Sequence, residues 1–239
     1  MAFGFFFLAI LGVTTAWLIQ ANKVCFSGQL RRLKPPLLVF DFDGTICPSF
    51  HLFIEHLNAL SEQYGHGKVQ PDQIENLRNL SARKVVGVLG VSRLKLPFLI
   101  RRIRINAQKQ LLELNPLSGL SEVIREFKKR GFSLGILTSN TEVNVRLYLQ
   151  KHNIDCFDFI YSGNNVFGKG AHLKAILKKS GLNPKEVMYI GDEARDMEAA
   201  KKAEVAAIAV SWGYNSKSAL MEQAPDRCID EPSQLLDLN

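Results

Sequence analysis

The sequence contains only four cysteines, and their spacing matches no common metal or disulfide motif. Cys25, Cys47, Cys156 and Cys228 lie far apart, and no C-x-x-C pair occurs. Zinc sites and disulfide frameworks both depend on closely or regularly spaced cysteines. The spacing therefore argues against both, and it favours a protein of a reducing compartment.

Other familiar ligand-binding patterns are also missing. The histidines are scattered, and His51 and His56 are spaced so that they do not share one face of a helix. Lys68 lacks the G-x-x-x-x-G-K-[ST] frame of a P-loop. No internal repeat or low-complexity tract occurs along the chain. We therefore interpret these histidines and Lys68 as ordinary residues.

Charge is absent from residues 1–22, the apolar N-terminal segment. Residues 2–19 read AFGFFFLAILGVTTAWLI, which is about long enough to cross a thinned bilayer. We interpret this run as a membrane-anchor candidate. A cleaved signal peptide is less attractive, because no basic segment precedes the run and no clear A-x-A site follows it. A buried helix and an overextended gene start are the alternatives.

Residues 23–36 are interpreted as a basic linker that ends at the stiff pair Pro35-Pro36. If the preceding run spans a membrane, the positive-inside rule predicts that the catalytic domain lies on the cytoplasmic side. The basic residues that support this orientation are Lys23, Arg31, Arg32 and Lys34.

The chain does have enough hydrophobic residues for a complete core. It contains 239 residues, of which 46% are hydrophobic, so one main domain with an accessory lobe is expected. The formal net charge of +7 favours anionic partners, namely phosphorylated metabolites, nucleic acid or an acidic membrane surface. Charge alone does not choose among the three.

From Leu37 onward, short apolar runs typical of buried strands alternate with amphipathic helical segments. This alternation predicts an α/β core, made by residues 37–48 and 118–239, with a parallel sheet covered by helices on both faces. The predicted strands cover residues 37–40, 132–140, 157–162, 187–192 and 205–210, and a short apolar run follows at 227–229.

Residues 49–117 interrupt the alternation and read as helices only, which predicts an all-helical second lobe inserted after the first strand. Its basic side chains outnumber its acidic ones. A solvated helix face, steering of an anionic substrate and contact with acidic lipid are the interpretations of this charge. Nucleic acid is not expected, because aromatic residues are not interleaved with the cations. The cations are Arg78, Arg83, Lys84, Arg93, Lys95, Arg101, Arg102, Arg104 and Lys109.

Polar side chains follow the predicted strands at the points where they end. Ligands of open α/β sheets bind at the carboxyl ends of the strands. Carboxylates that converge there repel one another unless a cation holds them, and their hard oxygens suit Mg²⁺. The sequence therefore predicts a magnesium site with one nearby lysine. The residues concerned are Asp41, Asp43, Thr138, Ser139, Asn140, Lys169, Asp192, Glu193 and Asp196.

Four of these features together resemble the motifs of the haloacid dehalogenase (HAD) superfamily: D-F-D-G-T from Asp41, a strand-ending Thr138, a lone Lys169 and G-D-x-x-x-D from Gly191. The resemblance runs from Leu37 to the C-terminus. The stretches GLSEVIREFKKRGFSLGILTSN, GDEARDMEAAKKA and AVSWGYNS resemble the phosphoglycolate-phosphatase-like branch. The resemblance implies a HAD-type Rossmann-like sheet with a small all-helical cap, and Mg²⁺-dependent hydrolysis of a small phosphomonoester.

The resemblance also implies a role for each motif residue. Asp41 resembles the nucleophile that forms an aspartyl-phosphate, and Asp43 resembles the general acid/base. Mg²⁺ would be held by Asp41, the backbone carbonyl of Asp43 and Asp192. Asp196 would brace the site from behind these ligands. Thr138, Ser139 and Lys169 would bind the substrate phosphate.

Simpler interpretations remain beside these roles. Thr138 could cap the next helix, although Asn140 suits that position better, and Lys169 could be a solvated loop lysine. Glu193 is interpreted as a first-turn carboxylate rather than a ligand. The alternative functions are a phosphomutase of the same branch and a catalytically idle, membrane-tethered scaffold. The sequence leaves the physiological substrate and the oligomeric state open.

Overall fold

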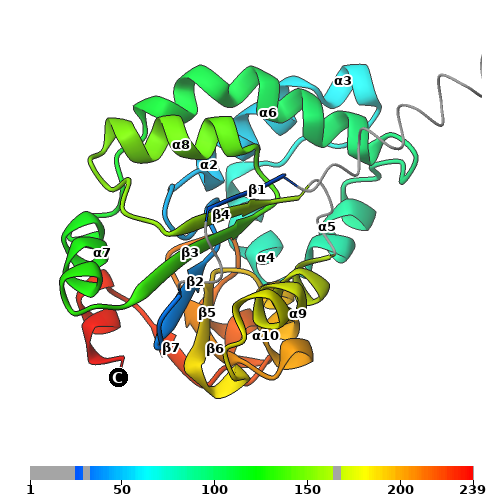
Figure 1. Cartoon of the computed structure of the whole chain (residues 1–239). Helices are drawn as coiled ribbons and strands as arrows, with labels where there is room; N and C mark the ends of the chain where they lie inside the picture. The colour runs from blue at the N-terminus through cyan, green and yellow to red at the C-terminus, as the bar shows by residue number, and fades with distance from the viewer. Residues whose placement is uncertain (1–24, 29–32, 164–167, 239) are drawn as a thin grey trace, which may run out of the picture.

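The computed structural model describes residues 25–28, 33–163 and 168–238. In this part of the chain, seven strands form one sheet in the order β1-β4-β3-β2-β5-β6-β7 (Figure 1). Strands β2 to β7 run parallel, and β1 pairs with the edge of β4 in the antiparallel direction. The strands are β1 Cys25–Gly28, β2 Leu37–Phe40, β3 Ser133–Thr138, β4 Phe159–Ser162, β5 Val187–Gly191, β6 Ala206–Val210 and β7 Arg227–Ile229.

Helices cover both faces of the sheet, as the near-continuous apolar strands require. Successive residues of β2 point to opposite faces. Leu38 and Phe40 belong to a core with helices α7 (Leu120–Lys129) and α8 (Glu142–Lys151). Leu37 and Val39 belong to a second core on the other face. The helices of that face are α9 Lys169–Ser180, α10 Ala194–Ala203 and α11 Lys217–Met221. The predicted α/β fold is therefore confirmed.

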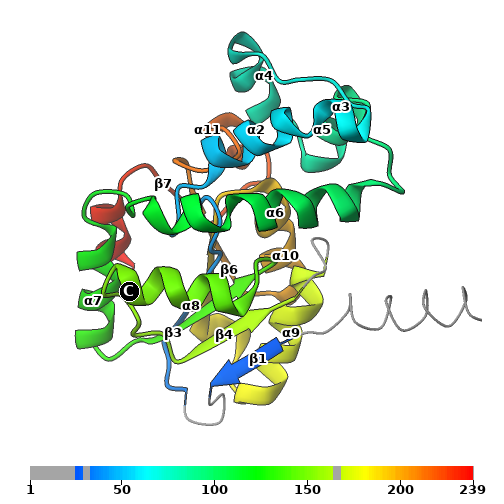
Figure 2. The same ribbon diagram turned by 90° about the horizontal axis from the view of Figure 1, so that it is seen from above.

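The cap lies between β2 and α7 in sequence and has its own apolar core. In Figure 2 its helices gather beyond one edge of the α/β core, while α6 runs back along it. The cap helices are α2 Phe50–Ala59, α3 Ser61–Tyr64, α4 Ile74–Arg78, α5 Ala82–Val88 and α6 Leu96–Glu113. The described residues also include short 3-10 helices, namely η2 Pro71–Gln73, η3 Pro184–Glu186 and η4 Pro232–Asp237.

Helix α6 joins the two lobes. Its buried residues Leu99 and Ile103 pack in the cap core. Ala107 and Leu111 pack instead in the core on the Leu38 and Phe40 face of β2, called here the core under β2. Residues four apart share one helix face, so a single apolar stripe serves both cores. The helix thereby fixes one side of the cap against the sheet.

The linker prediction for residues 23–36 does not hold throughout. Cys25–Gly28 forms β1, which pairs with Phe159–Ser162 far along the chain. A four-residue strand has no readable period, and its partner is set by the tertiary fold, so the local residues carry no signal for it. The membrane-anchor candidate at residues 2–19 lies outside the described residues. Within the described ranges, no helix has both the length and the apolar character that a membrane span needs.

Candidate active site

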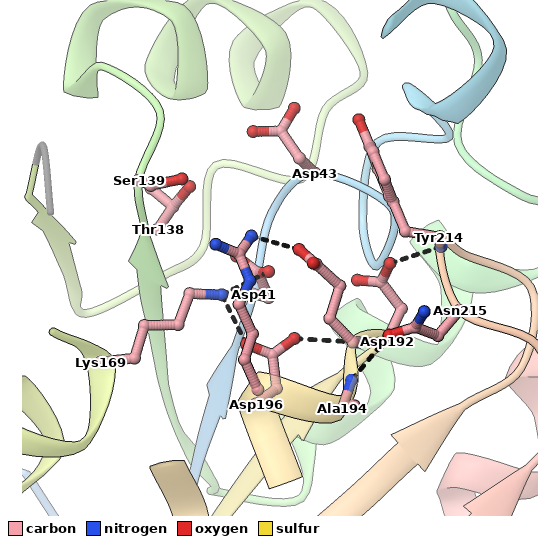
Figure 3. Close-up of polar contacts among 12 residues, drawn as sticks. Asp41, Asp43, Thr138, Ser139, Lys169, Asp192, Ala194, Asp196, Tyr214 and Asn215 are labelled. Atoms are coloured by element: carbon pink, nitrogen blue, oxygen red, sulfur yellow. Dashed lines mark hydrogen bonds and ion pairs between the residues drawn. The ribbon is translucent and has the colours of Figure 1, made fainter. Parts of the chain in front are cut away.

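Three strands carry the predicted site residues to one edge of the sheet. Strand β2 lies between β3 and β5, with Phe40 level with Ile136 and Ile190. Because all three strands are parallel, their carboxyl ends meet at that edge. Figure 3 shows the side chains that follow these strands gathered around one centre, with Lys169 at the start of α9 reaching in from the side.

Lys169 is the cation of this centre. Its Nζ lies 2.5 Å from Asp41 Oδ2 and 2.7 Å from Asp196 Oδ1. The three side chains are at most 4% exposed, so Lys169 is not a solvated lysine. Asp196 also accepts hydrogen bonds from the Tyr189 hydroxyl and the Glu193 backbone N–H. Asp196 thus holds the lysine while it anchors the first turn of α10.

Asp192 is held by a different set of donors. Thr45 Oγ1 donates to Asp192 Oδ1 at 2.7 Å, and the backbone N–H of Tyr214 donates to Oδ2 at 2.7 Å. Two glycines make room for this carboxylate: a Cβ at Gly44 would lie 2.1 Å from Asp192 Oδ2, and one at Gly213 would lie 2.2 Å away. Gly44 also has a φ of 81°, which side chains rarely adopt.

The charges of the centre do not balance among protein groups. Asp41, Asp192, Asp196 and the nearly buried Glu193 face two cations, Lys169 and an arginine at position 195 that pairs with Glu193. Burial raises the pKa of Asp41 to about 7, against the opposing charge of Lys169. Burial, followed by the charge of Asp41, raises the pKa of Asp192 well above its usual value. A further cation is needed for all four carboxylates to be ionised.

The carboxylate donors fit a small divalent cation. Oxygens of Asp41, Asp192 and Asp196 all lie within 4.8 Å of one another. Two uncompensated negative charges match one divalent ion, and an all-oxygen donor set suits a hard ion such as Mg²⁺. Asp192 has one protein donor on each oxygen and keeps lone pairs for a metal, whereas the oxygens of Asp196 accept three donors. Asp192 is therefore the better metal ligand of the two.

Asp43 lies apart from the carboxylate cluster. In Figure 3 its side chain projects away from Asp41 and Lys169. Its Oδ2 accepts a hydrogen bond from Asn140 Nδ2 at 3.0 Å, and its Oδ1 accepts one from Ser49 Oγ at 3.0 Å. The two aspartates of the first motif therefore occupy distinct environments, because the chain turns sharply after Phe42.

The end of β3 contributes hydroxyls and an amide. Thr138 Oγ1 accepts the backbone N–H of Asn140 at 2.9 Å, and Ser139 Oγ accepts a hydrogen bond from Arg104 of the cap at 2.9 Å. Neither Thr138 nor Asn140 caps the next helix. Thr141 does so by accepting the N–H of Asn144, so the expectation for Asn140 is wrong. The amide of Asn140 is directed to Asp43 instead.

Some residues of the site were not singled out from the sequence. Thr45 lies within the first motif and Arg195 within the last, so their positions were available but their partners were not. Tyr214 and Asn215 lie in the AVSWGYNS stretch that carried the resemblance, but their contacts with Asp192 and with the N–H of Ala194 could not be seen in the sequence. Arg104 belongs to a run of similar cap cations that sequence alone does not separate.

A cavity of about 530 Å³ lies beside this centre. Its wall is formed by the start of α5 in the cap, the first turn of α9 and the exposed side of α10. Arg83 and Lys174 contribute positive charge to the wall, and Lys169, Glu193 and Arg195 connect it to the carboxylate cluster. The cavity thus shares Lys169, Glu193 and Arg195 with the centre, whereas Asp41, Asp43 and Asp192 do not line it.

A parallel α/β core with an acidic strand-end site and a helical cap defines a class of hydrolases, and comparison with known proteins agrees. The family model for haloacid dehalogenase-like hydrolases matches residues 38–210. The chain belongs to that family, and it is a phosphatase. This confirms the resemblance found in the sequence motifs.

Individual relatives agree along most of the chain. A phosphoglycolate phosphatase of Synechococcus elongatus is 31% identical over 200 residues, which cover 83% of this chain and 94% of the relative. A pyrophosphatase of Bacillus mycoides is 24% identical and covers 85% of this chain and 96% of its own length. A solved structure described as a predicted phosphoglycolate phosphatase from Haemophilus somnus has the same fold, with a TM-score of 0.69, 20% identity and coverage of 85% and 97%.

Proposed function

We propose that the protein hydrolyses a small phosphomonoester through an aspartyl-phosphate formed on Asp41, with Mg²⁺ as cofactor. The observation that carries the proposal is the fixed orientation of the Asp41 carboxylate. Its Oδ1 accepts the N–H of Phe42 at 2.7 Å, and its Oδ2 pairs with Lys169. A nucleophile held in one rotamer reacts with little further loss of entropy.

Asp43 is the proposed general acid and base. It would protonate the departing alcohol and then activate the water that cleaves the acyl phosphate, so one residue serves both half-reactions. Asn140 and Ser49 hold its carboxylate away from the Asp41 cluster. This separation supports the division of roles, since a proton donor must face the leaving oxygen rather than the nucleophile.

The transferred phosphoryl group carries negative charge on three oxygens and needs donors. Lys169, the hydroxyl of Thr138 and the hydroxyl of Ser139 are the proposed donors. All three residues are buried, Thr138 and Ser139 at the end of β3 and Lys169 at the start of α9, so water does not screen the interaction strongly.

Asp41, the backbone carbonyl of Asp43 and Asp192 are the residues proposed to hold Mg²⁺. When bound, the ion supplies positive charge that offsets the charge of the phosphoryl oxygens. Asp196 acts through Lys169, which it positions, and not through the metal.

Phosphoglycolate is the first substrate to test, because the relative with 31% identity carries that activity in its name. The experiment is a panel of phosphate esters, assayed with Mg²⁺ and after its removal by chelation. Mg²⁺-dependent release of phosphate from at least one small ester is expected. A bisphosphorylated intermediate, with an isomeric monophosphate as product and no net phosphate release, would instead indicate a phosphomutase, and binding without turnover would indicate a scaffold. No observation specifically favours the phosphomutase or the scaffold.

The cellular location is a proposal that rests on the uncharged run at residues 2–19. A cytoplasmic catalytic domain tethered by this run should pellet with membranes and resist extraction by carbonate. A chain that begins at Lys23 keeps β1 and should remain in the supernatant with equal activity, since no site residue precedes Asp41. Recovery of the full-length protein in the supernatant would exclude the anchor.

A further inference from the structure

Arg104 is the cap residue whose side chain reaches the catalytic centre. It follows Ile103 on α6, at the point where the helix passes from the cap core to the core under β2. Its Nη2 lies 2.9 Å from Ser139 Oγ, next to Thr138 at the end of β3. The position of the helix between two cores therefore directs this guanidinium into the site.

The other cations of α6 are more exposed than Arg104. Arg101, Arg102 and Lys109 are exposed, in contrast to Arg104. Arg78, which also reaches the core, donates to the carbonyls of Ser211 and Gly213 and pairs with Glu75. Arg78 therefore ties the cap to a core loop through Nη2 and pairs with Glu75 through Nη1, whereas its buried Nε has no partner among the described residues.

Among the described residues, the hydrogen-bond partner of Arg104 is a neutral hydroxyl. A guanidinium has five N–H donors in a planar fork, which suits a carboxylate or a phosphate held by two parallel hydrogen bonds. Loss of water lowers the pKa of Arg104, and the charges of Asp43 and Asp41 only partly oppose this effect. A half-buried cation without an ion pair is costly, and an anionic ligand would offset that cost.

We propose that Arg104 binds a second anionic group of the substrate, a carboxylate one or two bonds beyond the ester carbon, and so selects small carboxylated phosphomonoesters. The inference rests on the proposed phosphatase function. With phosphorus at Asp41 and the leaving oxygen at Asp43, the leaving group faces the cap. Arg104 lies on the same side of the site, where its Nη2 donates a hydrogen bond to Ser139 Oγ. Asp43 is also the acidic group whose charge acts most strongly on Arg104, so a ligand that spans the two is compact.

The test compares two esters of similar size that differ in one group. Phosphoglycolate carries the carboxylate, and 2-hydroxyethyl phosphate carries a hydroxyl in its place. In the unaltered protein, kcat/KM should favour phosphoglycolate. In Arg104→Gln, kcat/KM for phosphoglycolate should fall by about 10- to 150-fold, the range expected for hydrogen bonds to a charged group. The value for 2-hydroxyethyl phosphate should change little, which removes the preference.

Two further arginines serve as controls. Arg102→Gln removes an exposed cation from the same helix and should leave both values unchanged. Arg83→Gln removes a cation from the wall of the neighbouring cavity. If Arg83→Gln and not Arg104→Gln abolishes the preference, the second anion lies in the cavity and the proposal is wrong.

The remaining outcomes are also distinct. Equal losses on both esters in Arg104→Gln would overturn the proposal, because the residue would then act on the phosphoryl group or on the fold. Should Arg104→Gln fail to fold, Arg104→Lys keeps the charge and should retain a reduced preference for phosphoglycolate. An unaltered protein that hydrolyses p-nitrophenyl phosphate without preferring phosphoglycolate contradicts only the role of Arg104. Absence of turnover with every ester contradicts the proposed function itself.

Discussion

The strand-end site and the cap differ in the burial of their charged side chains. At the strand ends, Asp41, Asp192, Asp196 and Lys169 are buried, and each has partners fixed by strands or helix starts. In the cap, residues 76–112 contain no acidic side chain, and most of the cations are exposed. We therefore propose that the backbone of the sheet positions the residues of the reaction, whereas substrate recognition depends on which cap side chains turn inward.

Replacement of the proposed nucleophile Asp41 should cause the largest loss of activity at the strand-end site. Asp41→Asn removes the attacking oxygen, so turnover should be undetectable for every ester tested, and no phosphoenzyme should form. The measurement is phosphate release together with radiolabel trapped on acid-quenched protein. Asp72→Asn, an exposed residue of the cap, is the matched control and should retain full activity.

Asp43→Asn should fail in a different manner from Asp41→Asn. Loss of general acid/base catalysis should lower turnover by roughly 10²- to 10⁴-fold for alkyl esters. Aryl esters with good leaving groups need little protonation, so they should still phosphorylate Asp41, and label should accumulate because the second step has lost its base. A loss that is independent of the leaving group, with no trapped phosphoenzyme, would mean that Asp43 is a structural carboxylate.

Stability should also distinguish the two regions. Lys169→Met leaves Asp41 and Asp196 buried without their shared cation, and the free energy of unfolding should fall by about 3–5 kcal/mol. The exposed cap residue Lys84 is the control, since Lys84→Met should change it by less than about 0.5 kcal/mol. Chemical denaturation without Mg²⁺ measures both. Equal, small losses would show that the buried ion pairs contribute little.

Much of the core site could be predicted because its signals are local. The end of each buried strand is visible in the sequence, and parallel strands must bring those ends to one edge, so Asp41, Thr138 and Asp192 could be identified from the residues alone. Lys169 required only the start of the helix that follows β4. These residues depend on backbone topology, which apolar runs and turns specify.

The remaining features depend on tertiary contacts that local patterns do not encode. Arg104 differs from Arg102 only in the face of α6 that it occupies, and that face is set by two cores at once. The Thr45 hydroxyl is bound to Asp192, whose position in the chain is distant. Strand β1 is short and takes its partner from the opposite half of the sequence. None of these leaves a periodic signal.

Stabilisation of the fold by Mg²⁺ should depend on Asp192 and not on acidic residues outside the site. At a Mg²⁺ concentration of 100 times the dissociation constant, binding should stabilise the fold by about 2.7 kcal/mol, a shift of roughly 5–11 °C for a domain of this size. Asp192→Asn should abolish most of the shift, whereas Asp72→Asn should preserve it. A full shift in Asp192→Asn, measured by thermal denaturation, would contradict the ligand assignment.

The smallest expected effect concerns the contact that joins the two regions. Arg78 donates to the carbonyls of Ser211 and Gly213 at 3.3 and 3.1 Å, in the loop whose next residue, Tyr214, donates to Asp192. Arg78→Met removes these hydrogen bonds while it keeps much of the side-chain volume. If the contact holds the cap closed over substrate, KM should rise by about 2- to 12-fold, the range for a typical intramolecular hydrogen bond, with kcat nearly unchanged.

The same variant can separate cap closure from support of the metal site. Glu75→Gln removes only the exposed partner of Arg78 and should leave both kinetic constants unchanged. Amide hydrogen exchange in α4 should accelerate in Arg78→Met, because the helix loses one of its attachments to the core, although the hydrogen bonds from Asn215 and Ser216 to the Arg78 carbonyl remain. If kcat and the Mg²⁺-induced thermal shift fall instead, while KM and exchange in α4 stay constant, then Arg78 serves the loop that holds Asp192. A cap residue would then support catalysis, and the proposed division between a catalytic core and a substrate-recognising cap would not hold for Arg78.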